Sequence, residues 1–475
     1  MRINHNSLAL NASDHFATIN KNIAKSMERL SSGYKITSPA DDAAGLAIST
    51  RMSAQIRGLD RAALNSNDGI SVIQSAEGGL DEIHSILGRM RELAIQASND
   101  VLSEEDRDAI QEEIDALKDE IDQIVDTTAF NEQKLLNGDM TRRTLSANPD
   151  METTFLSESV SVGVYELEVT VDATQAVYTT GITYSALTIS KEQAGSVFVN
   201  DFLVTIEEGM TMTEVFEEFQ THLHKIGIDV MASADGGVTE SEFSSGDPVL
   251  FVSQEYGSDQ EIEIRIENEE LAAILGMADG DLVAGTDCQA SITVSDEGFS
   301  STATVATLGN EITVTDRNGF EMVIETVPGA AAAGAVTTEI EVFSAGVMVI
   351  QTGANSGEQI ELDIPRLSSE RLDVDHLIMY THEYASKAVE KLDEAVKLVS
   401  NIRSKLGAYE NRLDDIYGNL EVQEESITAA YSRIMDTNMA EEMTNYTQQD
   451  VLSQAAISMM QKSNERPESI LQLLQ

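Results

Sequence analysis

The residues that could carry catalytic or metal-binding chemistry are few and scattered. The seven histidines are His5, His15, His84, His222, His224, His376 and His382. None belongs to an HExxH motif, in which two histidines one helical turn apart bind zinc. His222 and His224 are two residues apart, so on a helix they point in different directions. Cys288 is the only cysteine, which excludes an intramolecular disulfide and a cysteine metal cluster.

The motifs of common enzymes and nucleotide-binding proteins are also missing. The sequence contains no Walker loop, no GxSxG nucleophile elbow and no GxGxxG phosphate loop. Acidic side chains are numerous, but carboxylates on strand surfaces are far more often solvated than catalytic. We therefore predict no enzymatic activity, no catalytic, cofactor-binding or metal-binding residues, and no cofactor.

The charge of the chain restricts its partners. Its 82 Asp and Glu face only 30 Lys and Arg, which gives a formal net charge of -52. Such a field repels nucleic acids and anionic lipids and keeps an abundant protein soluble. The opening MRINHNSLALNASDHFATIN lacks the apolar core of a cleavable signal peptide, and no 18-residue apolar run occurs. We predict no nucleic-acid or membrane partner, and either a cytoplasmic location or export without a cleaved signal.

The elements that would position any site are helices at both ends of the chain. Apolar residues recur at steps of three and four in four stretches: Phe16, Ile19, Ile23, Met27 and Leu30; Ile83, Leu87, Met90, Ala94 and Ala97; Ile110, Ile114, Leu117, Ile121 and Ile124; Leu392, Ala395, Val399, Ile402, Leu406, Tyr409, Leu413, Ile416 and Leu420. A sustained period of 3.5 residues is typical of coiled coils. The fold class predicted is α+β multidomain, with an antiparallel α-helical coiled-coil bundle formed by both chain ends.

The middle of the chain has a different pattern. Residues 139–369 are rich in Val, Thr and Ile at period two, and Asn318-Gly319 marks a hairpin turn. One segment reads as a strand at 202–206, a helix at 212–225 and a strand at 228–231. We predict a β-rich outer insertion carried by the helical bundle.

Two segments of the N-terminal third have weak periodicity, LSSGYKITSPADDAAGLAIS (30–49) and QIRGLDRAALNSNDGISVIQSAEGGL (55–80). Gly33 and Pro39 stop a helix, and Asp41-Asp42 can cap the next one. These segments are interpreted either as connectors between helices or as close contacts between subunits. At the other end, Ile470, Leu471, Leu473 and Leu474 form an apolar tip that needs a partner to bury it.

At these segments the sequence resembles bacterial flagellin, the filament subunit of the flagellum. MRINHNSLALN, SSGYKITSPADDAAGLAIS, IRGLDRAALNSNDGISVIQSAEGGLDEI and RMRELAIQASND follow the family pattern at the N-terminus. KLGAYENRLD, ESITAAYSRIMDTNMAEEM and VLSQAAISMMQKSNERPESILQLLQ follow it at the C-terminus. The match covers roughly the first 140 and last 110 residues, in order. DFLVTIEEGMTMTEVFEEF resembles the short repeat of flagellin and hook-associated insertions. QTGANSGEQIELDI (351–364) resembles a segment that some flagellins carry beside the core bundle.

The resemblance implies a division of the chain into layers. Residues 1–32 and 441–475 would form an inner coiled coil, and residues 33–45 a spoke linker. Residues 46–138 and 370–440 would form the N- and C-terminal helical core, and residues 139–369 a variable outer domain. The filament and core interface would include Phe16, Ile19, Ile23, Met27, Leu30, Asp41, Asp42, Leu406, Leu413, Leu420, Ile470, Leu473 and Leu474.

The resemblance also implies a function and partners. The chain would be exported unfolded and would polymerise into the extracellular helical filament used for swimming. Its partners would be other copies of itself, an export chaperone at the C-terminal helix, the flagellar export apparatus, and the cap and hook-associated proteins. Arg89, Leu93 and Glu113 match the family positions recognised by a Toll-like receptor.

Three other functions fit parts of the same pattern. A hook–filament junction protein shares the two-ended coiled coil and the insertion repeat. A secreted coiled-coil adhesin would use the acidic insertion to bind its ligand, and some flagellins carry a protease in the outer domain. The ILQLLQ terminus and the DDAAGLAIS segment favour flagellin over the junction protein, and the missing HExxH argues against a metalloprotease.

Overall fold

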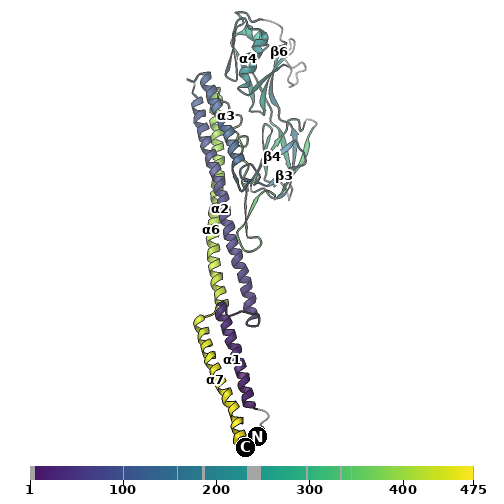
Figure 1. Ribbon diagram of the computed structural model, residues 1–475. Helices are drawn as coiled ribbons and strands as arrows, with labels where there is room; N and C mark the ends of the chain where they lie inside the picture. The colour runs from purple at the N-terminus through teal and green to yellow at the C-terminus, as the bar shows by residue number, and fades with distance from the viewer. Residues whose placement is uncertain are drawn as a thin grey trace. The chain divides into compact units, whose positions relative to one another are not determined.

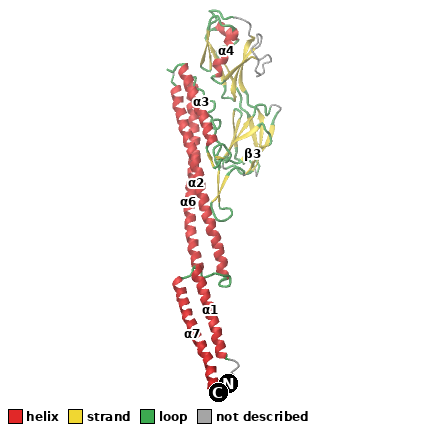
Figure 2. Cartoon of the chain, viewed as in Figure 1, coloured by secondary structure: helices red, strands yellow, loops and turns green. Residues whose placement is uncertain are grey.

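The computed structural model describes residues 6–99, 101–157, 159–183, 188–232, 248–295, 298–331, 334–343 and 345–473. The chain divides into two compact units. The terminal unit comprises residues 1–68, 351–360 and 412–475. The middle unit comprises residues 69–350 and 361–411. Figure 2 shows helices toward both chain ends, and among the described residues the strands lie between α3 and α6.

The terminal unit is built mainly from helices. It contains α1 (Ser7–Ser32), α7 (Met439–Leu473), residues 43–68 of α2 (Ala43–Ala97) and residues 412–435 of α6 (His382–Met435). The side chain of Asn6, which caps α1, donates from Nδ2 to the carbonyl of Ser463 at 3.0 Å. At the other end of α1, Arg29 faces Glu442 at 3.7 Å. These two contacts show that α1 and α7 pair antiparallel (Figure 1).

The middle unit contains the remaining parts of α2 and α6 together with α3 (Glu104–Thr127). The predicted helical stripes are confirmed here, because Ile83, Leu87, Met90, Ala94 and Ala97 are fully buried. Ser103 caps α3 in a reciprocal capping box with Asp106, which satisfies two backbone donors at the start of the helix. The coiled-coil bundle predicted from both chain ends is therefore present.

The interpretation of residues 55–80 as a connector is wrong. The whole segment lies inside α2, which runs without a break for 55 residues. Two of its glycines, Gly58 and Gly79, allow close packing. An added Cβ at Gly79 would lie 2.7 Å from Thr128 Oγ1 and 3.0 Å from Leu136 Cδ1, and one at Gly58 would lie 3.0 Å from Ala354 Cβ. A glycine inside a helix costs about 0.5–1 kcal/mol relative to alanine. At Gly79 the close packing against Thr128 and Leu136 leaves no room for a side chain, so glycine is needed there despite its lower helix propensity.

The β-rich insertion predicted between the helices is confirmed. Its strands are β1 (Ala129–Phe130), β2 (Gln133–Lys134), β3 (Arg143–Ser146), β4 (Met151–Leu156), β5 (Gly163–Val171), β6 (Gln175–Thr183), β7 (Gly195–Val199), β8 (Phe202–Ile206), β9 (Ile228–Ala232), β10 (Pro248–Tyr256), β11 (Glu261–Ile266), β12 (Asp281–Ala284), β13 (Gln289–Thr293), β14 (Thr304–Leu308), β15 (Glu311–Thr315), β16 (Glu321–Thr326), β17 (Val336–Phe343), β18 (Met348–Gln351) and β19 (Gln359–Leu362). The hairpin at Asn318-Gly319 joins β15 and β16, and Gly319 has the positive φ of 79° that such a turn requires.

These strands form two subdomains with separate hydrophobic cores. The β subdomain contains the sheets β13-β5-β17-β3 and β14-β15-β16-β4, packed around Tyr165, Phe299 and Ile324. The α4 subdomain contains the sheets β6-β10-β9 and β12-β11-β7-β8 with α4 (Met212–His224) and α5 (Glu269–Leu275). Its core surrounds Phe219 and Phe251, whose rings meet edge to face. The predicted strand, helix and strand at 202–231 are β8, α4 and β9.

The α4 subdomain is an insertion within the β subdomain. The chain leaves the β subdomain at Thr174 and returns at Thr286, and the two residues pair as an isolated antiparallel bridge. The Thr174 N–H donates to the Thr286 carbonyl at 2.8 Å, and the Thr286 N–H donates back at 3.1 Å. The two hydroxyls lie 2.7 Å apart. The two connections between the α4 subdomain and the β subdomain thus lie side by side and are hydrogen-bonded to each other.

Candidate subunit interface

The antiparallel pair of α1 and α7 meets along a narrow seam. The less exposed residues along this seam are, on α1, Ala9, Ala12, Phe16, Ile19, Ile23, Ser26 and Leu30, and on α7, Glu442, Tyr446, Gln449, Ser453, Ala456, Met460 and Ser463. Both sets alternate steps of three and four, as coiled-coil seams do. Among the described residues of these two helices, only Ser26, Glu442 and Ser453 are buried. Two helices alone therefore leave even their facing side chains partly in water.

The structure corrects the predicted stripe on α1 at one position. Phe16, Ile19, Ile23 and Leu30 lie on the seam, but Met27 is 55% exposed and Ser26 takes the seam position. Seam positions alternate steps of three and four residues. The step that leads to Ile23 is four, so the next seam position is three residues on, at Ser26 and not at Met27. Ser26 was missed because serine is not apolar. Met27 lies on a flank of the pair, where only another molecule could cover it.

Large apolar side chains are exposed on the flanks of the α1–α7 pair. They are Leu8, Leu10 and Met27 on α1, and Met439, Met443, Val451, Leu452, Ile457 and Met459 on α7. Met459 is the most exposed of them, at 68%. We name this set the flank residues. Large exposed apolar patches are typical of surfaces that bind other proteins.

The α1–α7 pair is fixed at one end by the loop between α1 and α2. Gly33 ends α1 with a φ of 75°, and its carbonyl accepts from the Thr437 N–H at 2.8 Å. Tyr34 bridges to Asp436, and the Lys35 N–H donates to the Met435 carbonyl at 2.7 Å. The loop therefore pairs with the turn between α6 and α7. We name residues 33–42 and 433–438 together the joint.

Asp41 is the polar centre of the joint. Its Oδ2 accepts four hydrogen bonds, from the N–H and hydroxyl groups of Thr37 and Ser38, at 3.1–3.3 Å. Its Oδ1 pairs with Lys25 and lies 4.0 Å from Arg29. The Lys25 ammonium is the main reason that the pKa of Asp41 lies well below its usual range, with the Ser38 and Thr37 donors adding to it against the effect of burial. The carboxylate is charged at any physiological pH.

Asp42, the second predicted interface acid, caps α2. Its Oδ1 accepts from the Gly45 N–H at 2.9 Å, which confirms the capping expected from Asp41-Asp42. Gly45 allows this close packing, because an added Cβ would lie 2.4 Å from Asp42 Oδ2 and 2.8 Å from Ile36 Cδ1. The two adjacent acids thus have separate tasks: Asp41 holds the joint and Asp42 starts the helix.

Farther along the terminal unit, α2 and α6 form a small apolar cluster. It contains Leu59, Ala62, Ala63 and Leu420, with Ala354 from the loop between β18 and β19. Asn65 holds this loop by donating from Nδ2 to the Gln351 carbonyl at 3.1 Å. Of the other predicted core residues on α6, Leu406 is 1% and Leu413 0% exposed.

The predicted receptor patch does not form one exposed surface. The Arg89 guanidinium donates two hydrogen bonds to Glu113 Oε1, at 2.9 and 2.7 Å, so these two side chains pair across α2 and α3. Leu93 is only 2% exposed and lies in the helical core. A partner approaching this face would meet Arg89 and Glu113 but not the Leu93 side chain.

The chain returns from the insertion to α6 through residues 365–381, which we name the strap. One face of α3 holds the backbone of the strap through polar side chains. Gln111 contacts the backbone of Leu377 and Met379, and Lys118 donates to the Asp375 carbonyl at 3.2 Å. Asp122 accepts from the Ser369 N–H at 2.9 Å and from its hydroxyl at 2.7 Å.

Arg107 completes this set at the start of α3. Its guanidinium donates to the carbonyls of Ala97 and Met379, at 2.6 and 3.3 Å, and to that of Asn99 at 3.2 Å. Arg107 is 8% exposed and satisfies its charge on carbonyl oxygens. No apolar period marks such contacts, so they were not predicted from the sequence.

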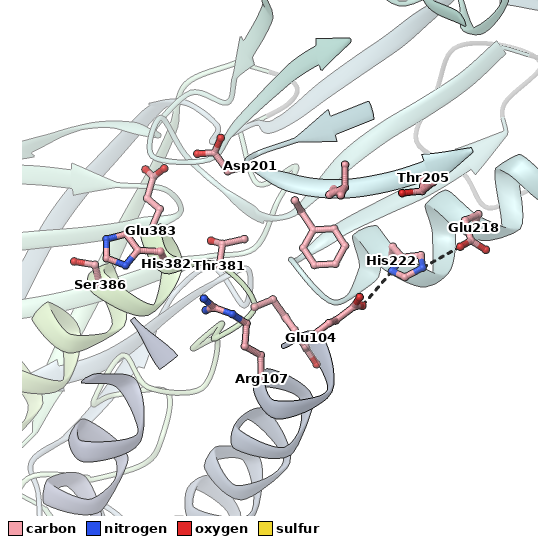
Figure 3. A pocket seen from close by; sticks show the side chains of 13 residues that line it. Glu104, Arg107, Asp201, Thr205, Glu218, His222, Thr381, His382, Glu383 and Ser386 are labelled. Carbon is pink, nitrogen blue, oxygen red and sulfur yellow. Dashed lines mark hydrogen bonds and ion pairs between the residues drawn. The ribbon is translucent and has the colours of Figure 1, made fainter. Parts of the chain in front are cut away.

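The middle unit has a crevice of about 800 Å³ between the start of α3, the start of α6 and strand β8. Its lining includes Glu104, Arg107, His222, Tyr380 and Glu383 (Figure 3). Acidic and basic groups alternate there with apolar ones. Among the described residues, no three His, Cys, Asp or Glu side chains gather as a metal-binding group.

Two further observations concern the chain ends and membranes. The helix α7 extends to Leu473, but the side chains of Ile470 and Leu473, and all of Leu474, lie outside the described residues. Within the part of the chain that the structure describes, no helix is both long and apolar enough to cross a membrane.

Paired chain ends with a thin seam and apolar flanks are typical of a structural protein that assembles with other copies of itself. Comparison with known proteins identifies the family. Residues 3–141 match the bacterial flagellin N-terminal helical region, and residues 389–474 match the bacterial flagellin C-terminal helical region. A flagellin of Clostridium tyrobutyricum is 32% identical over 98% of this chain and 100% of its own length. Flagellin C of Vibrio cholerae is 30% identical over 100% of this chain and 99% of its own.

The chain belongs to the bacterial flagellin family. It is a structural subunit of the flagellar filament, the extracellular polymer with which bacteria swim. The hook–filament junction protein considered from the sequence has no better support, because the full-length relatives above are flagellins.

Proposed function

We propose that this chain polymerises through the α1–α7 pair and the joint, and that the flank residues become buried by neighbouring copies. The observation that carries the proposal is the exposure of the flank residues on a pair whose own seam is only partly closed. Full burial of a Leu, Ile or Met side chain stabilises by about 1.5–3 kcal/mol. Several such side chains per subunit provide a strong drive to assemble.

The proposed layers follow the family division. Residues 1–32 and 441–475 form the inner coiled coil, and residues 33–45 link it to the next layer. Residues 46–138 and 370–440 form the helical core, with contacts between subunits, and residues 139–369 face outward. An interface between two different faces of the subunit, repeated without closing a ring, gives an open helical filament.

Assembly and export are linked in this proposal. A pair of helices with so few buried residues is marginal in water as a single molecule and becomes ordered when it binds other copies. Before export, the apolar flank of α7 offers a binding surface for a cytoplasmic chaperone. The chain then passes unfolded through the flagellar export apparatus. Cap and hook-associated proteins contact the same surfaces at the two ends of the filament.

We also propose that a Toll-like receptor recognises the face that carries Arg89 and Glu113. The Arg89–Glu113 pair is about half exposed, with side-chain exposures of 49% and 44%. A charged pair with this access can contact a receptor once subunits are released from a filament.

The test is seeded polymerisation, followed by electron microscopy. Full-length protein and a chain lacking residues 442–475 are added to filament fragments. We expect only the full-length protein to extend the seeds, while circular dichroism shows that the shortened chain keeps its middle unit folded. Growth by the shortened chain would exclude α7 as an assembly element. A full-length protein that stays monomeric under all seeding conditions would favour the junction protein or the adhesin.

A further inference from the structure

The α4 subdomain contacts the helical part of the middle unit through a set of charged and aromatic side chains. Lys225, just after α4, lies 3.1 Å from Asp108 and 3.4 Å from Glu104, both on α3. Its ammonium also lies 5.4 Å from the centre of the Tyr380 ring. Asn200 donates from Nδ2 to the Tyr384 hydroxyl at 2.9 Å. The contact is therefore polar, and protons can change its strength.

His222 lies in this contact between two carboxylates. Its Nε2 is 3.1 Å from Glu218 on the same helix, and its Nδ1 is 3.5 Å from Glu104 across the contact (Figure 3). Nδ1 is buried and has no hydrogen-bond partner. The imidazole also packs against the Phe202 ring, with 5.8 Å between the ring centres. Lys225 and Asp108 are the next charged groups around it, and Arg107 and Glu383 line the same crevice.

His376 has the same arrangement on the strap. Its Nε2 is 2.9 Å from Asp375, the preceding residue, and its Nδ1 is 3.9 Å from Glu255 on β10 of the α4 subdomain. The other charged groups that face it are Lys118 on α3, Lys391 on α6 and Asp373 on the strap. The imidazole is more exposed than that of His222, with 57% against 24% of the side chain accessible.

In both places one ring nitrogen faces a carboxylate on its own element and the other faces a carboxylate across the contact. A neutral imidazole attracts mainly the carboxylate to which its single N–H donates. An imidazolium attracts both, through a hydrogen bond to the nearer carboxylate and an ion pair with the one across the contact, at 3.5 Å for His222 and 3.9 Å for His376. We propose that protonation of His222 and His376 tightens the contact of the α4 subdomain with α3 and the strap. The subdomain is then held firmly in weakly acidic medium and moves more freely in alkaline medium.

The sign of the effect follows from the neighbouring charges. The hydrogen bond to Asp375 is the main reason that the pKa of His376 lies above 6.5, although Lys118 opposes this. Asp375 lies on the strap itself, so the part of the stabilisation that belongs to the contact comes from the charge of Glu255, which also raises the pKa of His376. This stabilisation is complete below pH 6.5 and is lost as the pH rises through the raised value.

The experiment measures the distance between α4 and α3 in full-length monomer. Spin labels are attached at Gln220→Cys and Ala116→Cys, which are exposed positions on α4 and α3, while the native Cys288 is buried. Electron–electron double resonance gives the distance distribution at several values between about pH 5 and about pH 8, the range in which histidine titrates. We expect a narrow distribution in acid that broadens as the pH rises.

Three variants decide whether the histidines cause the change. We expect H376Q to remove part of the broadening and H222Q/H376Q to abolish it. H224Q is the matched control, because His224 is on the same helix but pairs with Asp229 within the α4 subdomain. A distribution that does not change with pH in the labelled parent protein, or one that changes equally in H222Q/H376Q, would overturn the proposal. If circular dichroism shows that H222Q/H376Q is misfolded, the variant E104Q takes its place. We expect E104Q to reduce the change of the distance distribution with pH, and an unreduced change would contradict the proposal.

Discussion

The side-chain oxygen of Gln111 accepts a hydrogen bond from the backbone N–H of Met379 at 2.9 Å. The amide nitrogen of the same side chain donates to the Leu377 carbonyl at 2.9 Å. One glutamine on α3 therefore makes the two hydrogen bonds that a neighbouring β-strand would offer to the strap. Leu377 and Met379 are buried, so the strap depends on α3 to satisfy its backbone.

The first prediction concerns this glutamine. Gln111→Ala leaves a buried N–H and a buried carbonyl without partners, and we expect a loss of about 1–3 kcal/mol in the free energy of unfolding of the middle unit. Urea unfolding followed by circular dichroism measures it. Gln123→Ala, at an exposed position of the same helix, is the control and should change little. Equal stability of both variants would show that the strap is held by its apolar residues alone.

The second prediction concerns Asp41 and pH. Because its pKa is lowered in the joint, its contribution is complete above its ordinary pKa of 3.8 and is lost as the pH falls below that value. Asp41→Asn removes the charge that faces Lys25 and Arg29, so we expect faster hydrogen exchange across residues 25–41 at neutral pH. Wild-type protein should approach the exchange of the variant only in strong acid. Identical exchange at neutral pH would mean that the charge does not stabilise the joint.

The third prediction separates the flank residues from the seam. Met459→Asp places a charge at the most exposed flank position, so monomer stability should change by no more than about 0.5 kcal/mol. Growth from filament seeds should stop, because the charge would be buried against a neighbouring subunit. Gln461→Asp, on the opposite flank and already polar, is the control and should still extend the seeds. Normal filaments of Met459→Asp would remove this position from the interface.

The fourth prediction concerns receptor recognition. Arg89→Ala and Glu113→Ala should each weaken signalling by monomer in Toll-like receptor reporter cells by about fivefold or more, which corresponds to roughly 1 kcal/mol. Leu93→Ala should act differently, because deleting a buried leucine costs about 2–5 kcal/mol of stability. Unfolding measurements on all three variants distinguish the two effects. Full signalling by both charge variants would exclude this face as the recognition site.

The fifth prediction uses the single cysteine. Burial, and secondarily the charge of Asp287, raises the pKa of Cys288 to about 11. With this pKa, about one thousandth of the thiol is ionised at pH 8, so reaction with a disulfide reagent should be very slow in folded protein. The thiol should react rapidly once urea unfolds the β subdomain. Fast reaction in native buffer would show that the core around Cys288 opens locally.

Much of the helical fold could be predicted because burial repeats with the period of the helix. Leu392, Val399 and Leu406 were placed correctly for this reason, as were Ile83 and Leu87. The pattern failed at Met27, where the register selects Ser26, because an apolar side chain on a flank looks the same in the sequence as one on the seam. It failed again at residues 55–80, where glycines that serve close packing resemble helix breakers.

The polar contacts were not predictable in the same way. Arg107 and Gln111 bind backbone carbonyls and N–H groups of the strap, and backbone groups carry no sequence signal. Asp41 pairs with Lys25 of α1, which lies 16 positions earlier in the sequence. Arg29 of α1 pairs with Glu442 of α7, which is much farther away in the sequence. Such partners become apparent only when the fold brings them together.

The paired residues Thr174 and Thr286 make the α4 subdomain an exchangeable cassette. Because the chain enters and leaves it at two hydrogen-bonded positions, residues 175–285 can be removed and the gap closed by a very short linker. Thr174 and Thr286 bond to each other through backbone and hydroxyl groups, and the cassette adds a backbone hydrogen bond from the Gly257 N–H to the Thr174 carbonyl at 3.2 Å. Lineages can therefore enlarge, replace or lose this module without redesigning the rest of the subunit, and an engineer can use the same position to display a foreign domain.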